Sequence, residues 1–350
     1  MAAGLGQGRG RPVPTTALAM VGVSLAATAV VAVDIGATVV SSIGLAALVG
    51  VTVLTWDRSE ASDAVPLTTG LVAGAVAGAA LCAYQLLLAG NPRATGPFWH
   101  ANVLGAAAAV TTVGLCSVAL RVRSRGRVAF YLLGALASAG MILMSMSRGA
   151  LLATAVGLVI LALFPVPSLS TLCKVPRQRI RVATLFVAAL GLLAFAYPLV
   201  ARRLELADTT IDDSRRDLIW QVTFELAAER PLLGNGFGVW SRLVSEHEPA
   251  INTFATTHAH SLYLQLLFDV GTVGTAALVG AALSCIFLAL RARPHLWAPV
   301  TSVVTASAVS SVAEPLAYWW QYDLVLLIAL LAACYQPRSS GTGPPRPSER

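Results

Sequence analysis

The chain has 350 residues, of which 56% are hydrophobic and only 12% are charged, and its mean hydropathy is +0.73. This composition is too apolar for a water-soluble domain with an ordinary polar surface, and it predicts an integral membrane protein. The net charge of +7 arises mainly from basic loops beside apolar runs, so it gives no indication of nucleic-acid binding. The five cysteines are dispersed without a CxxC pair, which argues against a zinc module or a disulfide framework.

Apolar runs of the length that spans a membrane recur along the chain. A helix needs roughly 20 apolar residues to cross a hydrocarbon core. About ten runs approach that length, at residues 15–33, 35–55, 67–89, 99–120, 128–146, 149–166, 180–200, 260–290, 296–313 and 316–335. The first run resembles a signal peptide, but a second follows at once, which favours a retained anchor. We therefore expect an all-α polytopic membrane protein with about ten transmembrane helices and one extracytoplasmic helical loop domain.

The basic loops predict the orientation of these helices. Lys and Arg near helix ends remain on the cytoplasmic side. If the spans alternate, the basic segments fall on one face: Arg9 and Arg11, RVRSRGR at 121–127, KVPRQRIR at 174–181, RAR at 291–293, and the C-terminal arginines. This orientation places both termini in the cytoplasm. The loop at 90–98, the turn at Ser147 and Arg148, and the segment at 201–259 then lie outside.

The predicted spans divide the chain into five parts. Residues 1–14 and 336–350 form a cytoplasmic head and tail whose composition is typical of disordered segments. Residues 15–200 carry transmembrane helices 1–7, and residues 260–335 carry helices 8–10. Between these two membrane parts, residues 201–259 form the extracytoplasmic loop domain.

The loop domain contains a predicted amphipathic helix. Its six arginines and nine acids give it a charge of about −3, unlike a simple basic tether. The stretch DDSRRDLIWQVTFELAAERPLLGNG predicts a helix that Ser214 caps and that ends at Pro231 and the following glycines. Arg216 and Trp220 lie four residues apart, so they share one face of this helix.

Three arginines outside the membrane are candidates for anion binding. Arg148, in MSMSRGALLA, lies between two apolar arms on the side where arginine is disfavoured, and this position favours a functional role. Arginines in the cytoplasmic loops, by contrast, act as topology signals. Arg216 has an alternative role in pairing with Asp212 or Asp213, and Arg93 has one as an interfacial anchor.

Two histidines, His258 and His260, precede the apolar run of HAHSLYLQLLFDVG. Such histidines are commonly structural residues. A zinc site would need two further ligands, and the EHE segment at 246–248 has no spacing typical of one, so no metal is predicted. GNGFG at 234–238 lacks the βαβ context of a phosphate-binding loop and is predicted to be a turn.

The arginines and histidines together point to one kind of chemistry. Guanidinium groups bind phosphate through paired, charge-assisted hydrogen bonds. A histidine at the start of a helix, where the helix dipole favours anions, can accept a proton at neutral pH. The combination predicts group transfer on a lipid-linked diphosphate at the outer side of the membrane that the chain spans.

Three segments resemble motifs of the O-antigen ligase and Wzy-type polymerase superfamily of bacterial membrane proteins. They are RATGPFWHANVLGAA at 93–107, SMSRGALLA at 145–153, and RDLIWQVTFELAAERPLLGNGFG followed by HAHSLYLQLLFDVGTVG. The first is similar to the family's R-x-[ST]-G-x-F-x-x-x-N segment and the second to its SRG hairpin. The third is similar to its R-x-x-x-W...P-x-x-G-x-G-x-G and H-N-x-x-L-x-x-x-x-x-x-G pattern. Order, spacing and predicted topology agree over a family-like core at about 90–285.

This resemblance implies an inverting, metal-independent glycosyltransferase with a GT-C-like fold and no cofactor. Its donor would be an undecaprenyl-diphosphate-linked glycan on the outer face of the cytoplasmic membrane. His260 would be the base that activates an acceptor hydroxyl, and Arg148 and Arg216 would hold the donor diphosphate, with Arg93 a weaker candidate. Supporting roles would fall to His258, Trp220, Asn102 and Ser261. The acceptor would be a glycan, a lipid or a protein, and other proteins of envelope-polysaccharide assembly are further candidate partners.

The chain departs from the family pattern in two respects. Ser261 occupies the position where the family usually has Asn, and its hydroxyl can still hydrogen-bond and cap the helix. About ten spans are also fewer than the dozen or so common in the family.

Several alternatives stay open. Polymerase and ligase share a donor and differ in an acceptor that the sequence does not identify. A transporter or flippase for the same lipid would place ionisable groups within the spans, where Asp269 and Asp323 are the main candidates. A noncatalytic scaffold of envelope assembly is the third alternative.

Overall fold

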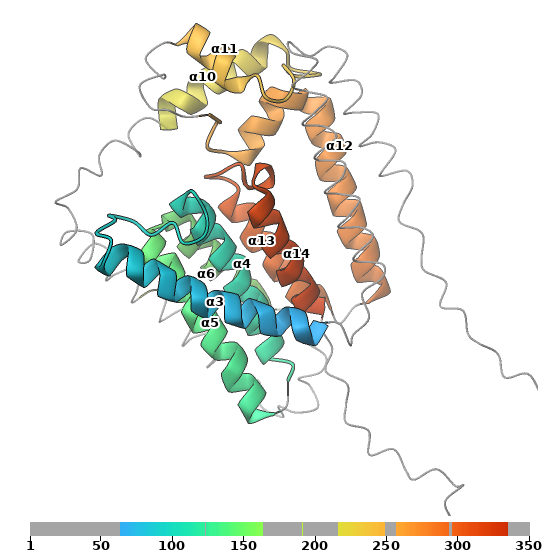
Figure 1. The fold of residues 1–350 in the computed structure, drawn as a ribbon. Coiled ribbons are helices and arrows are strands. Elements are labelled where there is room, and N and C mark those ends of the chain that lie inside the picture. Colours follow the sequence, from blue (N-terminus) through green and yellow to red (C-terminus); the bar gives the residue numbers. More distant parts are fainter. Residues whose placement is uncertain are drawn as a thin grey trace, which may run out of the picture. The chain divides into compact units, whose positions relative to one another are not determined.

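A computed structural model of the chain describes residues 64–122, 124–163, 191, 216–248, 257–293 and 296–334 (Figure 1). The regular elements within these residues are all helical, as predicted. The predicted spans at 15–33, 35–55 and 180–200 lie outside the described residues. So do the predicted head at 1–14 and the predicted tail at 336–350.

Each apolar run predicted within the described residues forms a helix. These helices are α3 (Ala64–Leu87), α4 (Ala101–Ala119), α5 (Arg125–Ser145), α6 (Arg148–Leu163), α12 (Leu262–Ala292), α13 (Trp297–Ser310) and α14 (Trp320–Cys334). In the described part of the chain, 4 helices are long and apolar enough to cross a membrane: α3, α4, α5 and α12. The α-helical membrane class is therefore confirmed, and the full number of about ten spans stays a prediction.

The chain forms two compact units, which we describe separately. The described residues of the first unit are 216–248, 257–293 and 308–323, and those of the second are 64–122, 124–163, 191, 296–307 and 324–334. The first unit contains α10 (Arg216–Glu229), α11 (Trp240–His247) and α12, together with the short 3-10 helix η3 (Leu316–Tyr318). The predicted domain limits at residues 200 and 260 stay a prediction.

In the second unit, helix α4 packs against α3, α5 and α6. Every residue of α4 is buried, and most are Ala, Gly, Val or Thr. Small side chains let neighbouring helix backbones approach closely in a membrane protein. A Cβ atom on Gly105 would lie only 2.7 Å from the Cβ of Ser147, so glycine allows the turn before α6 to pack on α4.

Arg121 connects the ends of two helices in the same unit. Its side chain is buried, and its Nε donates a hydrogen bond of 2.8 Å to the carbonyl of Ser117 in α4. One of its terminal nitrogens donates a bond of 3.1 Å to the carbonyl of Ala332 in α14. Arg121 thus has a packing role as well as the topological role that the sequence indicates.

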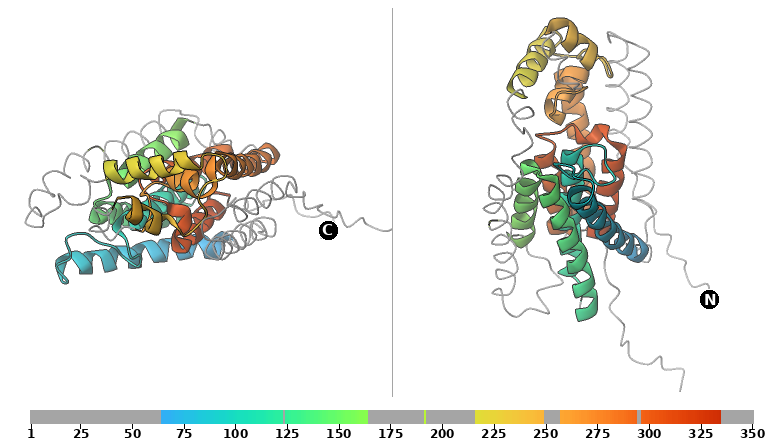
Figure 2. Two further views of the ribbon diagram at one scale, coloured as in Figure 1. Left: turned by 90° about the horizontal axis from the view of Figure 1, so that it is seen from above. Right: turned by 60° about the vertical axis from the view of Figure 1, so that its left-hand side comes forward.

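In the first unit, the loop after α10 is bound to a break in α12. Gly271 interrupts α12 with φ 66° and ψ −172°, a conformation that favours glycine. The freed backbone bonds to the loop: Thr272 N–H donates to Pro231 O at 2.8 Å, and Asn235 N–H donates to Phe268 O at 2.8 Å. Both views of Figure 2 show α10 and α11 beside the start of α12.

An apolar core holds α10, α11 and the start of α12 together. Its members include Ile219, Val222, Trp240 and Phe268, all buried. The Trp240 indole donates a hydrogen bond of 3.0 Å to the hydroxyl of Thr223, so the one polar atom of this large side chain is satisfied. The packed core fixes the position of α10 relative to the segment that carries the two histidines.

Candidate functional site

The histidine segment is held in an unusual backbone conformation just before α12. His260 has φ 50°, the left-handed region that few residues other than glycine adopt, at a cost on the order of 1 kcal/mol. The N–H of Ala259, between the two histidines, donates a 2.8 Å hydrogen bond to Gln265 Oε1 in α12. Ser261 occupies the N-cap position of α12, as predicted, but its side chain makes no capping hydrogen bond, so that part of the prediction is wrong.

The start of α12 also binds the segment that follows α13. The N–H of Leu262 donates a 2.9 Å hydrogen bond to the carbonyl of Ser311, and the hydroxyl of Tyr263 donates one of 2.9 Å to the carbonyl of Ala308. These bonds bring Glu314, which lies between α13 and η3, to the histidine segment. The sequence separation of Glu314 from His260 is 54 residues.

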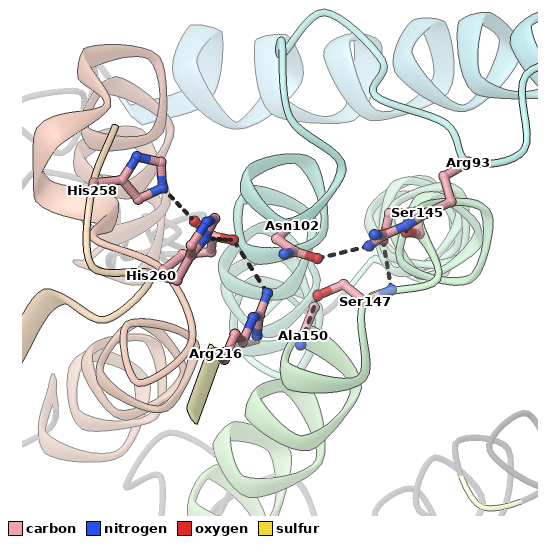
Figure 3. A network of polar contacts seen from close by, with 9 residues as sticks. Arg93, Asn102, Ser145, Ser147, Ala150, Arg216, His258 and His260 are labelled. Atoms are coloured by element: carbon pink, nitrogen blue, oxygen red, sulfur yellow. Dashed lines mark hydrogen bonds and ion pairs between the residues drawn. The ribbon is translucent and has the colours of Figure 1, made fainter. Parts of the chain in front are cut away.

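Glu314 is the centre of a polar cluster in the first unit, which we call the Glu314 cluster: Arg216, His258, His260 and Glu314. The side chain of Glu314 is only 2% exposed. One carboxylate oxygen, Oε1, lies 3.4 Å from His260 Nδ1 and 3.7 Å from a terminal nitrogen of Arg216. The other, Oε2, lies 3.4 Å from His258 Nε2. Figure 3 shows the side chains of Arg216, His258 and His260 directed toward one another, and each contacts this carboxylate.

The two imidazole rings are in contact and tilted relative to each other, with ring centroids 4.4 Å apart and an angle of 56° between their planes. His258 also contacts the edge of the Trp319 ring, and its Nδ1 lies 3.1 Å from the hydroxyl of Thr257. Both nitrogens of His258 are therefore directed, one toward Thr257 and one toward Glu314. The side chain of His258 is 18% exposed, and that of His260 is 11% exposed.

A second set of hydrogen bonds braces the histidine segment from within α12. Asp269 is fully buried, and both of its oxygens accept from Gln265 Nε2, at 3.2 and 3.1 Å. This orients the Gln265 amide so that its oxygen faces Ala259. The Tyr318 hydroxyl donates a hydrogen bond to Asp269 as well. Asp269 therefore has a bracing role in the first unit.

Helix α10 presents Arg216 and Trp220 from one face, as predicted. The atoms Arg216 Nε and Trp220 Nε1 are buried and have no hydrogen-bond partner among the described residues. Buried donors of this kind call for an explanation, since an unmet donor costs roughly 1–3 kcal/mol. Asp212 and Asp213, the alternative partners of Arg216, lie outside the described residues, as does the predicted cap Ser214.

Two of the predicted arginines and Asn102 belong to the second unit. Arg93 donates from a terminal nitrogen to Asn102 Oδ1 at 2.7 Å and from Nε to the carbonyl of Ser145 at 3.0 Å (Figure 3). Arg148 is the first residue of α6 and is exposed, and the preceding Ser147 hydroxyl accepts from the N–H of Ala150 at 3.4 Å. The motif residues Arg93 and Asn102 thus contact each other, and Arg148 lies at a helix N-terminus, where anions are favoured.

The remaining predictions for this region concern the glycine segment and the acidic EHE segment. Gly234, Gly236 and Gly238 all have positive φ, which confirms a turn. In EHE, His247 pairs with Glu225 of α10 at 3.5 Å. Among the described residues, the donor atoms of His258, His260 and Glu314 lie within 4.8 Å of one another, which is close enough to hold a metal ion.

Glu314 was not predicted from the sequence. The residue lies in AVSSVAEPLAYWW, in the two-residue gap between the apolar runs at 296–313 and 316–335. A single acid between two spans is also typical of a solvated turn, so the sequence offered no reason to select it. The available signal was its combination with proline in a very short gap between two predicted spans, on the side predicted to be outside, which leaves the carboxylate close to the apolar runs.

Residues 133–279 match the family model described as O-Antigen ligase. The match covers less than half of the chain and includes Arg148, Arg216, His258 and His260. It confirms the resemblance over these residues. Comparison with curated proteins found no match.

Proposed function

We infer that this membrane protein, whose residues 133–279 match the O-antigen ligase family, ligates or polymerises glycans carried on a lipid diphosphate. The proposed donor is a glycan on undecaprenyl diphosphate, and the proposed site faces the outer side of the cytoplasmic membrane. The acceptor is a hydroxyl group of a glycan, a lipid or a protein. Both chain termini are proposed to lie in the cytoplasm, in agreement with the basic loops.

The observation that carries this proposal is the meeting of two motif residues at one buried carboxylate. Arg216 and His260 belong to separate motifs, and both contact Glu314 Oε1, at 3.7 and 3.4 Å. A base with a carboxylate partner and an arginine beside it provides the parts needed for proton removal and for binding an anionic leaving group.

His260 is the proposed general base. Its Nδ1 faces Glu314, so a proton on Nδ1 leaves Nε2 as the acceptor for the proton of the attacking hydroxyl. The carboxylate holds the ring in place and stabilises the imidazolium that forms on proton transfer. The Nδ1 to Oε1 distance of 3.4 Å is long for a hydrogen bond, as is common before substrate binds.

The proposed reaction is a single displacement. The acceptor oxygen forms a bond to the anomeric carbon as the bond from that carbon to the diphosphate oxygen breaks. The acceptor proton moves to His260 Nε2, and undecaprenyl diphosphate leaves with the bonding electrons. Attack from the side opposite the leaving group inverts the anomeric configuration, and no step requires a metal.

The leaving diphosphate is proposed to bind to arginines. Arg216 Nε and Trp220 Nε1 are buried donors without a partner among the described residues, and phosphate oxygens would satisfy them. Arg148, at the N-terminus of α6, adds a guanidinium to the positive end of a helix dipole. Arg93 is proposed to act mainly by fixing Asn102 and the end of α5, since two of its nitrogens donate to these groups.

The direct test is a transfer assay with the purified full-length protein in lipid nanodiscs, a lipid-diphosphate-linked glycan and cell-envelope glycan as acceptor. His260→Ala should lower the rate of transfer roughly 100-fold or more, the contribution typical of a general base. His247→Ala is the matched control, since His247 pairs with Glu225 on the surface of the loop domain. Normal transfer by the His260 variant would refute the assignment of the base.

A further inference from the structure

We propose that His258, His260 and Glu314 form a zinc-binding site, and that zinc bound there switches off glycan transfer. The binding of zinc stands on the geometry of these three side chains alone. The effect on transfer rests on the proposed function, because it requires His260 to be the base. Zinc would then be a reversible inhibitor of a reaction that proceeds without metal.

The three side chains supply donor atoms at the separation that zinc requires. Tetrahedral zinc with bonds of about 2.0–2.1 Å holds neighbouring ligand atoms about 3.3–3.4 Å apart. Glu314 Oε1 lies 3.4 Å from His260 Nδ1, and Glu314 Oε2 lies 3.4 Å from His258 Nε2. One donor atom from each residue lies within 4.8 Å of the other two. Small side-chain adjustments therefore suffice to place all three around one ion.

The type of ligand favours zinc over the alkaline-earth cations. Two imidazoles and one carboxylate are a ligand set typical of zinc, whereas magnesium and calcium prefer sites made of oxygen alone. His258 Nδ1 contacts the hydroxyl of Thr257 at 3.1 Å, and this contact directs Nε2 toward Glu314. A partner of this kind orients a ligating histidine and strengthens metal binding.

Arg216 is the cation that zinc would displace. Its terminal nitrogen lies 3.7 Å from Glu314 Oε1, and its side chain is 21% exposed, so it can turn away from an incoming ion. Three protein ligands leave a fourth position for water or for an anionic ligand. The carboxylate of Glu314 would thus exchange its contact with a guanidinium for a contact with a divalent cation, and its own charge would stay the same.

Zinc at this site would remove the proposed base. A metal on Nδ1 leaves the ring proton on Nε2, and that nitrogen can no longer accept a proton from the acceptor hydroxyl. Zinc also occupies the carboxylate that would stabilise the imidazolium. Both consequences act on proton transfer, so inhibition should lower the maximal rate more than it raises the Michaelis constant of the donor.

Zinc binding can be measured without any transfer assay. The full-length protein in nanodiscs is treated with a chelator, dialysed and titrated with zinc by calorimetry, and with Co²⁺ by visible absorption. We expect one strong site with a tetrahedral cobalt spectrum, and at least about ten-fold weaker binding in His258→Ala and in Glu314→Gln. His247→Ala and Glu225→Gln, which alter an exposed histidine and acid pair, should bind zinc normally. No strong site, or equal binding by Glu314→Gln, would overturn the proposal.

The second measurement follows transfer as the zinc concentration rises. Each variant is compared with its own zinc-free rate, and Mg²⁺ serves as the control ion. His258→Ala should need at least about ten times more zinc for half inhibition than the unaltered protein. Zinc that binds without slowing transfer would overturn the switch. Zinc binding in a protein that never transfers glycan would support the metal site and contradict the proposed function instead.

Discussion

Glu314 joins side chains from three separate parts of the chain. Arg216 begins α10, the histidines precede α12, and Glu314 follows α13. Each of the other three side chains nevertheless has a nitrogen within 3.7 Å of a Glu314 carboxylate oxygen. A buried carboxylate is stable only when cationic or hydrogen-bonding groups compensate it. The left-handed backbone of His260 is further evidence of a specialised site, because strain of this kind persists only where the surroundings impose it.

Replacing Glu314 with Gln should separate base activation from diphosphate binding. The amide keeps the size of the side chain but cannot stabilise an imidazolium, so we expect kcat to fall roughly 100-fold while the Michaelis constant of the donor changes little. Steady-state kinetics of transfer in nanodiscs will measure both. Glu225→Gln, on the surface of α10, should retain normal kinetics. A Glu314→Gln enzyme with unchanged kcat would show that the carboxylate plays no part in proton transfer.

Arg148 offers a second prediction at this scale. Lysine retains its charge but cannot bind a phosphate through two parallel hydrogen bonds. We expect Arg148→Lys to raise the Michaelis constant of the donor roughly ten-fold, equivalent to about 1.4 kcal/mol of binding energy. Arg125→Lys, at the exposed start of α5, is the matched control. Equal kinetics of the two variants would remove Arg148 from the diphosphate site.

The sequence indicated His260, Arg148 and Arg216 because they lie in motifs, and it identified their candidate roles. Glu314 could not be selected, since its importance arises from hydrogen bonds between the start of α12 and the segment after α13. Such contacts depend on tertiary packing and leave no periodic pattern in the sequence. The role of Ser261 was likewise misjudged, because a residue at an N-cap position need not direct its hydroxyl to the helix.

At the level of elements, the glycine motif and the histidine motif form one structural unit. Gly234 lies against Asp269, and Gly271 lies against Leu232, so each motif contains a glycine that the backbone of the other requires. This lock holds the loop after α10 on α12 and thereby places Arg216 near His260. The sequence predicted the turn and the helix, whose local signals are strong. It did not predict that they bind each other, because a glycine can indicate that another backbone segment lies close but does not indicate which segment that is.

Gly271→Ala tests the lock. An added Cβ would lie 2.4 Å from the carbonyl carbon of Leu232, and φ 66° disfavours any side chain. We expect destabilisation of at least about 2 kcal/mol, seen as a lower thermal unfolding temperature in detergent. Gly280→Ala is the control in the same helix, because a Cβ there meets nothing within 4 Å. If both variants unfold at the same temperature, the lock does not stabilise the fold.

At the level of the whole molecule, hydropathy predicted the helices well because membrane thickness fixes their length. The predicted runs at 99–120 and 128–146 correspond to α4 at Ala101–Ala119 and α5 at Arg125–Ser145. The limits differ by a few residues. Helix α5 begins before its run because the polar residues Arg125 and Arg127 contribute to the helix and not to the apolar run, whereas α4 is slightly shorter than its run at both ends. The orientation of the chain across the membrane stays a prediction from its basic loops.

The proposed function requires the residues assigned to donor binding to contact the lipid diphosphate. The Glu314 cluster belongs to the first unit, whereas Arg93, Asn102 and Arg148 belong to the second. The family match includes residues of both units.

Photolabelling tests this requirement most directly. A lipid-diphosphate donor with a photoreactive diazirine on its first sugar is bound to the full-length protein in nanodiscs, irradiated and mapped by peptide mass spectrometry. We predict labels both at the turn before α6, around Ser147 and Arg148, and at the segment of His258 and His260. Both labels should be lost together in Arg216→Ala. Absence of a label from either segment, or labels at the basic segment 121–127, would contradict the proposed donor-binding residues.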